Sequence, residues 1–286
     1  SMTIDELKKL MTTLGDKPFR AKQIYSWLHE HLVTSYDEMT NLSKTLREKL
    51  DREYEIALVR LVERQISSID GTNKFLFRLY DGNVVESVLM KYKHGNSVCI
   101  SSQVGCRMGC RFCASTIGGL TRCLLPSEML DQIYRIQALT GERVSNVVVM
   151  GTGEPLDNYE NLLRFIHILT EEGGLHISQR NLTVSTCGLV PKIYDLAKEK
   201  LQMTLALSLH APNDVKRREL MPIANKYSMD EVLEACRYYF KETGRRITFE
   251  YSLVAGVNDS DEDARELSGR IRDMTVSYTH LRAHET

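Results

Sequence analysis

The chain has 286 residues, of which 42% are hydrophobic and 26% charged, with 37 basic against 38 acidic side chains. This composition excludes collagen, coiled-coil and disordered classes. The balanced charge neither indicates nor excludes a nucleic-acid partner. No apolar run approaches the roughly 18 to 20 residues that a membrane helix needs, and no apolar signal region opens the chain. We therefore expect a cytoplasmic protein that does not enter a membrane.

Residues 1–52 predict a small helical domain. Thr3 and Glu6 have the spacing of a capping box, which opens a helix with apolar residues on one face. Two more helices of the same kind are expected, one after Pro18 and one that carries leucines over residues 42–50. The charge of this domain gives only weak support for a role in RNA binding, and a helical cap on the main domain is an equal alternative.

Residues 53–94 predict a β-hairpin connector. Apolar and polar residues alternate from Thr72, Asp81-Gly82 supplies the turn, and a second apolar strand follows. Glu86 lies on that second strand with apolar neighbours on its own face, so it needs a partner or a shifted pKa. The alternative is a glutamate that faces water at a sheet edge.

Residues 95–274 predict an α/β domain. Short strands rich in Val, Ile, Leu and Thr alternate with helices, which indicates parallel strands joined by right-handed crossovers. The expected strands are 97–102, 145–150, 182–186, 203–209 and 247–253, and the expected helices are 128–139, 159–169, 229–242 and 262–273. A doubly wound sheet and a (β/α) barrel both place ligands at the carboxyl ends of the strands, so the site is expected in the loops there.

The first of these loops carries a cysteine motif. The chain has seven cysteines and no secretion signal, which favours thiols that act as ligands or reactants over a disulfide scaffold. Cys106, Cys110 and Cys113 form C-x3-C-x2-C, which suits an iron–sulfur cluster with one open iron. Zinc is the rival, but structural zinc prefers four ligands in two pairs, and no second pair follows.

Polar residues follow three further strands. The loop Gly151-Thr-Gly-Glu154-Pro155 lacks the third glycine of a dinucleotide fingerprint, and it offers backbone groups and Glu154 to a ligand. The next two strands end in Ser185 and in Ser208-Leu209-His210. Each hydroxyl alone is as easily a helix cap. Their coincidence at successive strand ends favours a binding site.

Together these motifs resemble the radical-SAM superfamily, whose hallmarks are C-x3-C-x2-C with an aromatic residue before the last cysteine, here Phe112, and a GxGEP loop. Within it the chain is similar to the bacterial ribosomal RNA adenine-C2 methyltransferases, which also methylate a tRNA anticodon-loop adenine. The similarity extends over residues 4–273 and includes the segments 17–20, 37–40, 101–106, 150–155, 208–212, 221–223 and 256–259.

The resemblance implies a partial (β/α)6 radical-SAM barrel, incomplete at its C-terminal end, after the RNA-binding helical domain and the β-hairpin connector. Cys106, Cys110 and Cys113 would hold a [4Fe-4S] cluster whose open iron binds S-adenosylmethionine (SAM). The family's contacts to SAM match Gly153, Glu154, Ser185, Ser208, Leu209 and His210. Glu86 matches the family's proton acceptor, and Cys99 matches the cysteine that closes a disulfide to resolve the protein–RNA adduct.

The implied activity uses two SAM molecules, one that methylates a C-terminal cysteine and one that is cleaved to a 5′-deoxyadenosyl radical. That radical takes a hydrogen from the methyl group, and the carbon radical adds to adenine C2, an electron-poor carbon that polar methyl transfer does not reach. The implied substrates are 23S rRNA and tRNA. The implied electron donor is a flavodoxin or ferredoxin, and the protein is expected to be a monomer.

The chain departs from the family at its end. The methyl-carrying cysteine, the sixth barrel strand and an asparagine that contacts the cofactor are not found, and residues 275–286 lack strand periodicity and predict a non-native tail. We therefore expect a truncated chain that binds the cluster and cleaves SAM but does not complete RNA methylation. The alternatives are a C8-methylating relative that confers antibiotic resistance and a non-catalytic metal- or RNA-binding module.

Overall fold

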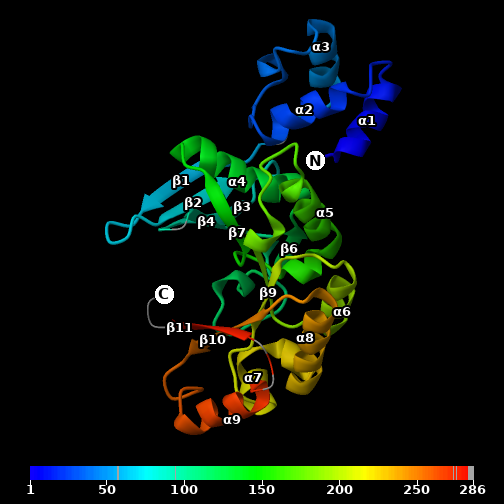
Figure 1. The fold of residues 1–286 in the computed structure, drawn as a ribbon. Helices are drawn as coiled ribbons and strands as arrows, with labels where there is room; N and C mark the ends of the chain where they lie inside the picture. The colour runs from blue at the N-terminus through cyan, green and yellow to red at the C-terminus, as the bar shows by residue number, and fades with distance from the viewer. Residues whose placement is uncertain (57, 94, 273, 275, 283–286) are drawn as a thin grey trace. The chain divides into compact units, whose positions relative to one another are not determined.

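The computed structural model describes residues 1–56, 58–93, 95–272, 274 and 276–282, and for 276–282 the backbone only. The chain forms two compact units, each considered by itself (Figure 1). The first comprises Ser1–Val98, Leu125–Asn146 and Glu160–Ser178, and the second comprises Cys99–Leu124, Val147–Tyr159 and Gln179–Thr286. The predicted boundaries at 52, 94 and 274 divide the chain differently and stay a prediction; residues 94 and 275 lie outside the described residues.

The first unit begins with the three expected helices, α1 (Ile4–Thr13), α2 (Arg20–His29) and α3 (Lys44–Glu53). The predicted capping box is present, because the Thr3 hydroxyl accepts the Glu6 N–H and the Thr3 N–H donates to the Glu6 carboxylate. Each helix buries one apolar stripe, which is the stripe that the sequence periodicity indicates. The buried residues of these stripes include Leu7, Met11, Ile24, Leu46 and Leu50.

A buried histidine of α2 makes the first unit sensitive to acid. His29 Nδ1 lies 2.8 Å from the Tyr134 hydroxyl, and its Nε2 has no hydrogen-bond partner in the described part of the chain. Burial, helped by the nearby N-terminal amine, lowers the pKa of His29 to about 3. The folded chain therefore holds a neutral imidazole at pH values where the unfolded chain is already protonated.

We expect this histidine to destabilise the protein as the pH falls. Its folded-state pKa lies below the unfolded one, so its contribution is complete above the unfolded pKa and is lost as the pH falls from there toward the folded pKa. Between about pH 7.5 and 5.0 the loss amounts to about 2 kcal/mol. Denaturant unfolding at both pH values should show that His29→Gln reduces the acid-induced loss by this amount. An equal loss in both proteins would contradict the assignment.

Three antiparallel strands follow, β1 (Arg60–Ile66), β2 (Asn73–Arg78) and β3 (Val84–Tyr92). The expected hairpin is β2 and β3, whose inward face carries Phe75, Phe77, Val85 and Leu89. β1 was not expected. It is exposed along its whole length, so it lacks the alternation that reveals a half-buried strand.

The structure decides between the two alternatives that the sequence leaves open for Glu86. The residues directly before and after Glu86 in the chain lie on the inward face of β3. Glu86 itself lies on the outward face, and its side chain is 52% exposed. Its carboxylate forms an ion pair with Lys74 on β2, at 2.8 Å. Glu86 therefore has a partner in a solvated setting and is not an acid enclosed by apolar side chains. The first unit also contains β4 (Gly95–Cys99) up to Val98, α4 (Pro126–Thr140), and all of α5 (Tyr159–Thr170) except Tyr159.

The second unit is built on the predicted parallel strands. β7 (Val144–Val149), β8 (Leu182–Thr186), β9 (Thr204–Ser208) and β10 (Ile247–Leu253) follow one another in sheet order and pair in parallel. The intervening helices are α6 (Val190–Lys198), α7 (Asp214–Leu220), α8 (Met229–Thr243) and α9 (Asp261–Ile271). The short strands β5 (Gln103–Gly105) and β6 (Leu120–Cys123) pair antiparallel. The predicted α/β class with a mostly parallel sheet is confirmed.

One more strand extends this sheet. β11 (Val276–Arg282) pairs in parallel with β10, with Ile247 opposite Val276, so the expectation that a sixth strand is missing is wrong (Figure 1). That residues 275–286 are a non-native tail stays a prediction. A β-ladder is formed by backbone groups, and the free edge of β10 offers N–H and C=O groups to any extended segment. Residues 275 and 283–286 of the predicted tail lie outside the described residues. Among the helices that the structure describes, none has the length and apolar character needed to cross a bilayer.

Candidate active site

A cavity of about 270 Å³ opens at the carboxyl ends of the parallel strands in the second unit. This is where the α/β architecture was expected to place a ligand. Of the residues predicted from the sequence, eight line it: Cys106, Cys110, Cys113, Gly153, Glu154, Ser185, Ser208 and His210. The side chains come from four separate loops and strand ends, so the fold brings together what is dispersed over a hundred residues of sequence.

The three cysteines lie on a tight loop between β5 and β6. Gly105 has φ +74° and sits so close to Gly119 that a Cβ would lie 1.9 Å from its carbonyl oxygen, so only glycine fits. The Cys106 N–H donates to that same carbonyl at 3.0 Å, which anchors the start of the loop. Cys113 N–H donates to the Cys110 carbonyl at 3.1 Å and closes the turn between these two cysteines.

The cysteines of this loop need a positively charged partner in order to be thiolates. Burial, followed by the charges of Cys113 and Cys106, raises the pKa of Cys110 to about 12, and burial also raises the pKa of Cys106. Thiolates gathered in one cavity thus need positive charge to be stable, which bound iron supplies. Among the described residues, no three Cys, His, Asp or Glu side chains are grouped around a single ion position. Cysteines that hold a cubane cluster bind separate irons, and three thiols that line one cavity fit that cofactor.

Glu154 joins the second loop to the end of β8. Its carboxylate accepts the N–H groups of Cys187, at 2.8 Å, and Leu156, at 3.1 Å, and its own N–H donates to the Gln103 amide at 2.8 Å. Burial raises the pKa of Glu154. Gly153 precedes it with φ +107°, in contact with Gln103. These bonds hold the loop against the strand end, at the wall of the cavity.

A glutamate that the sequence argument missed organises the two serines. Glu250, on β10, is 9% exposed, and one of its carboxylate oxygens accepts both the Ser185 and the Ser208 hydroxyls, each at 2.9 Å. Because the hydrogens of the serines are directed at Glu250, their oxygens remain as acceptors for a donor group of a ligand. The sequence does contain a signal for Glu250, because it is an acidic residue within a predicted strand of the parallel sheet, where most side chains are buried.

His210 completes the wall. Its Nδ1 accepts the Ser252 N–H at 3.0 Å, so the ring proton of the neutral form lies on Nε2. Burial, helped by Arg217, lowers the pKa of His210 to about 4, so the ring is neutral at physiological pH. Its edge packs on Phe112 of the cysteine loop, with ring centroids 4.8 Å apart.

Three predicted site residues do not line this cavity. Leu209 has a fully buried side chain, and its N–H and C=O are bonded to Glu250 and Arg217. Cys99 lies at the end of β4, and burial raises the pKa of its thiol to about 11. Glu86 belongs to the first unit. All seven cysteines are free thiols, so the disulfide that the resemblance implies is not supported.

Two family models match this chain. Residues 1–56 match the ribosomal RNA large subunit methyltransferase N-terminal domain, and residues 100–268 match the radical SAM superfamily. The crystal structure of a radical SAM methyltransferase from Sphaerobacter thermophilus has a TM-score of 0.92 at 44% identity, over 98% of this chain and 83% of that one.

Two relatives carry the same description, probable dual-specificity RNA methyltransferase RlmN. The protein from Lachnospira eligens is 65% identical over 274 residues, which are 96% of this chain and 78% of the relative. The protein from Lachnoclostridium phytofermentans is 64% identical over 268 residues, which are 94% of this chain and 75% of the relative.

The fold and the cavity thus define a radical-SAM enzyme, whose cofactors are a [4Fe-4S] cluster and SAM. With these similarities, the chain belongs to the RlmN family of dual-specificity RNA methyltransferases. The alternative of a non-catalytic metal- or RNA-binding module is therefore wrong.

Proposed function

We propose that this chain carries the cofactor site of an enzyme that methylates C2 of an adenine in 23S rRNA and in the tRNA anticodon loop, a reaction that also requires the methyl-carrying cysteine not found among the seven cysteines of this chain. The observation that carries the proposal is the single cavity in which the three cysteines meet Gly153, Glu154, Ser185, Ser208 and His210. The N-terminal match to a ribosomal RNA methyltransferase domain and the relatives' names, which specify RNA methylation with dual specificity, support the substrate class.

In this proposal Cys106, Cys110 and Cys113 hold the cluster. The hydroxyl oxygens of Ser185 and Ser208 accept hydrogen bonds from SAM, and His210 donates one from Nε2, as their contacts with Glu250 and Ser252 favour. Gly153 and Glu154 contact the cofactor from the opposite loop. Contact by Leu209 stays a prediction without geometric support, because its side chain is buried and its backbone groups are already bonded.

The chemistry needs two SAM molecules, because one supplies the methyl group and the other is cleaved reductively with an electron from the cluster. Glu86 acts as proton acceptor in this proposal; its side chain is half exposed on β3, and its carboxylate forms an ion pair with Lys74. Cys99 would resolve the protein–RNA adduct by closing a disulfide with the family's methyl-carrying cysteine, which was not found among the seven cysteines of this chain. A flavodoxin or ferredoxin supplies the electron, and the enzyme works as a monomer in the cytoplasm, where rRNA and tRNA are found.

The test is incubation of the reconstituted chain with SAM, reductant and either 23S rRNA or tRNA, followed by mass spectrometry of the nucleosides. We expect release of 5′-deoxyadenosine, and we expect every methyladenosine that forms to carry the methyl group at C2. RNA in which the target adenine is replaced by guanine is the matched control. Methylation of that control, or no cleavage of SAM by protein that holds a full cluster, would contradict the proposal.

The second candidate is the C8-methylating relative. Pro155, directly after Glu154, favours C2 specificity in the comparison of motifs, and in the structure it begins the short 3-10 helix Pro155–Asn158 beside the cavity. The same mass spectra decide between the two, since 8-methyladenosine and 2-methyladenosine separate chromatographically.

A further inference from the structure

The segment Gly256-Val-Asn-Asp259 has no role in the site described above, although it is one of the motifs that the sequence makes conspicuous. It lies in the loop between β10 and α9, and its Asn258 is 1% exposed. A fully buried amide needs partners for two donors and one acceptor, or it destabilises the fold. The partners of Asn258 therefore indicate what the motif does.

Both donors and the acceptor of the Asn258 side-chain amide are bonded, and the two donated bonds go to residues that line the cavity. Its Nδ2 donates to the carbonyl oxygens of His210, at 2.7 Å, and Ser252, at 2.8 Å, and its Oδ1 accepts the Val254 N–H at 2.7 Å. Only an amide of this length provides both donors and the acceptor. An aspartate in the same place would direct a carboxylate at two carbonyl oxygens.

His210 needs such support, because its backbone is in the left-handed region, with φ +55°. This conformation costs a non-glycine residue roughly 1 kcal/mol or more and persists only where neighbours fix it. Asn258 bonds the carbonyl of His210, and Ser252, also held by Asn258, provides the N–H that fixes its Nδ1. One side chain thus supports the backbone of His210 directly and its ring through Ser252.

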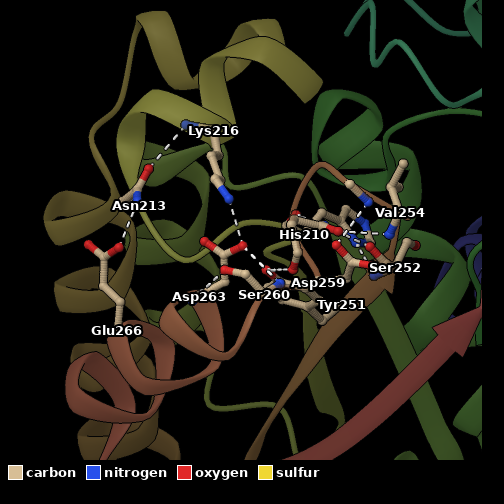
Figure 2. Close-up of polar contacts among 12 residues, drawn as sticks. His210, Asn213, Lys216, Tyr251, Ser252, Val254, Asp259, Ser260, Asp263 and Glu266 are labelled. Atoms are coloured by element: carbon tan, nitrogen blue, oxygen red, sulfur yellow. Dashed lines mark hydrogen bonds and ion pairs between the residues drawn. The ribbon is translucent and has the colours of Figure 1, made fainter.

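The loop that carries Asn258 is itself anchored. The Gly256 N–H donates to Asp259 at 2.9 Å, and Ser260 caps α9 through the Asp263 N–H. Figure 2 shows the further ties from α7 to α9, in which Lys216 contacts Asp263 at 2.6 Å and the Asn213 amide contacts Glu266 at 2.7 Å. The loop that carries Asn258 is therefore anchored at its α9 end by the contacts between α7 and α9, and its other end continues from β10.

We propose that Asn258 is a positioning residue for SAM, which holds His210 in its left-handed conformation and in the single tautomer that presents the Nε2–H to an acceptor atom of SAM. The inference rests on the proposed function, because it takes His210 as a contact of the cofactor. A loop residue with a structural role alone would affect stability without changing the histidine tautomer.

The test combines a ligand-free readout with a binding readout. Long-range ¹H–¹⁵N spectra of the imidazole groups, with His210 assigned through His210→Gln, report the tautomer in the absence of cofactor. Titration calorimetry on cluster-loaded protein reports the affinity for SAM. Asn258→Asp, which keeps the size of the side chain, and Asn258→Ser, which keeps one donor, are compared with Leu267→Ala, a buried α9 residue away from the cavity lining.

We expect wild type and Leu267→Ala to show one Nε2–H tautomer for His210. Both Asn258 variants should show mixed tautomers and bind SAM at least about 10-fold more weakly, which corresponds to about 1.4 kcal/mol. A single Nε2–H tautomer in both folded Asn258 variants would overturn the inference, and so would an equal loss of SAM affinity in Leu267→Ala. Wild-type affinity in His210→Gln would overturn the link to SAM and, separately, the proposed role of His210.

Discussion

Replacing Cys110 by alanine is expected to abolish cluster binding and, with it, reductive cleavage of SAM. Cys110 lies between the other two predicted ligands on a loop that is closed by its own carbonyl and anchored at Gly119. Two thiolates cannot hold a cluster that already lacks a fourth cysteine. After anaerobic reconstitution, about four irons and four sulfides per chain should bind to wild type and fewer than about one to the variant. Formation of 5′-deoxyadenosine should fall more than about 100-fold, the upper range for loss of outer-sphere partners.

The matched control is Cys236→Ala, which also removes a cysteine thiol, but from a position outside the cavity. Cys236 is fully buried on α8 and does not line the cavity, so its loss should lower the free energy of unfolding and leave the iron content unchanged. Full iron in the Cys110 variant would contradict the assignment of this loop. Equal loss of iron in both variants would attribute the effect to unfolding.

The helices and parallel strands could be predicted because their periodicity reflects what they bury. The apolar stripe of α1, with Leu7 and Met11, has helical spacing, and the middle of β9, residues 205–207, is apolar because both faces of that strand are buried. β1 has no buried face, and β11 pairs through its backbone, so neither has a pattern that reveals it. The sequence predicts an element well only where burial selects the side chains.

The site shows the same division between local and tertiary information. The cysteine spacing and the polar strand ends are local, and they predicted eight residues that line the cavity. The ion pair of Glu86 with Lys74 depends on the pairing of two strands, so the sequence alone left its environment open between two alternatives. The contacts of Glu250 and Asn258 also join separate strands and loops. Such residues are recognisable in sequence only as polar side chains in an apolar context.

Glu250→Gln is expected to weaken SAM binding about 10-fold while the cluster and the fold stay intact. The carboxylate accepts two serine hydroxyls, and hydrogen bonds to a charged acceptor are stronger than those to a neutral amide by about 1 kcal/mol each. Without the charge, the Ser185 and Ser208 hydrogens are free to turn toward the ligand, which the serines must meet as acceptors. The cavity also loses a negative charge that attracts the sulfonium and ammonium groups of SAM.

Calorimetric titration of SAM into cluster-loaded protein measures this effect, and Glu234→Gln is its control. Glu234 is an exposed glutamate of α8, so the same chemical change there should leave the affinity at the wild-type value. Because Glu250 is buried at the cavity wall, salt screens its attraction to the positive groups of SAM only weakly, so the loss in Glu250→Gln should persist at raised ionic strength. Wild-type affinity for SAM in Glu250→Gln would contradict the prediction, because it would show that neither the charge of Glu250 nor its direction of the serine hydroxyls contributes to SAM binding.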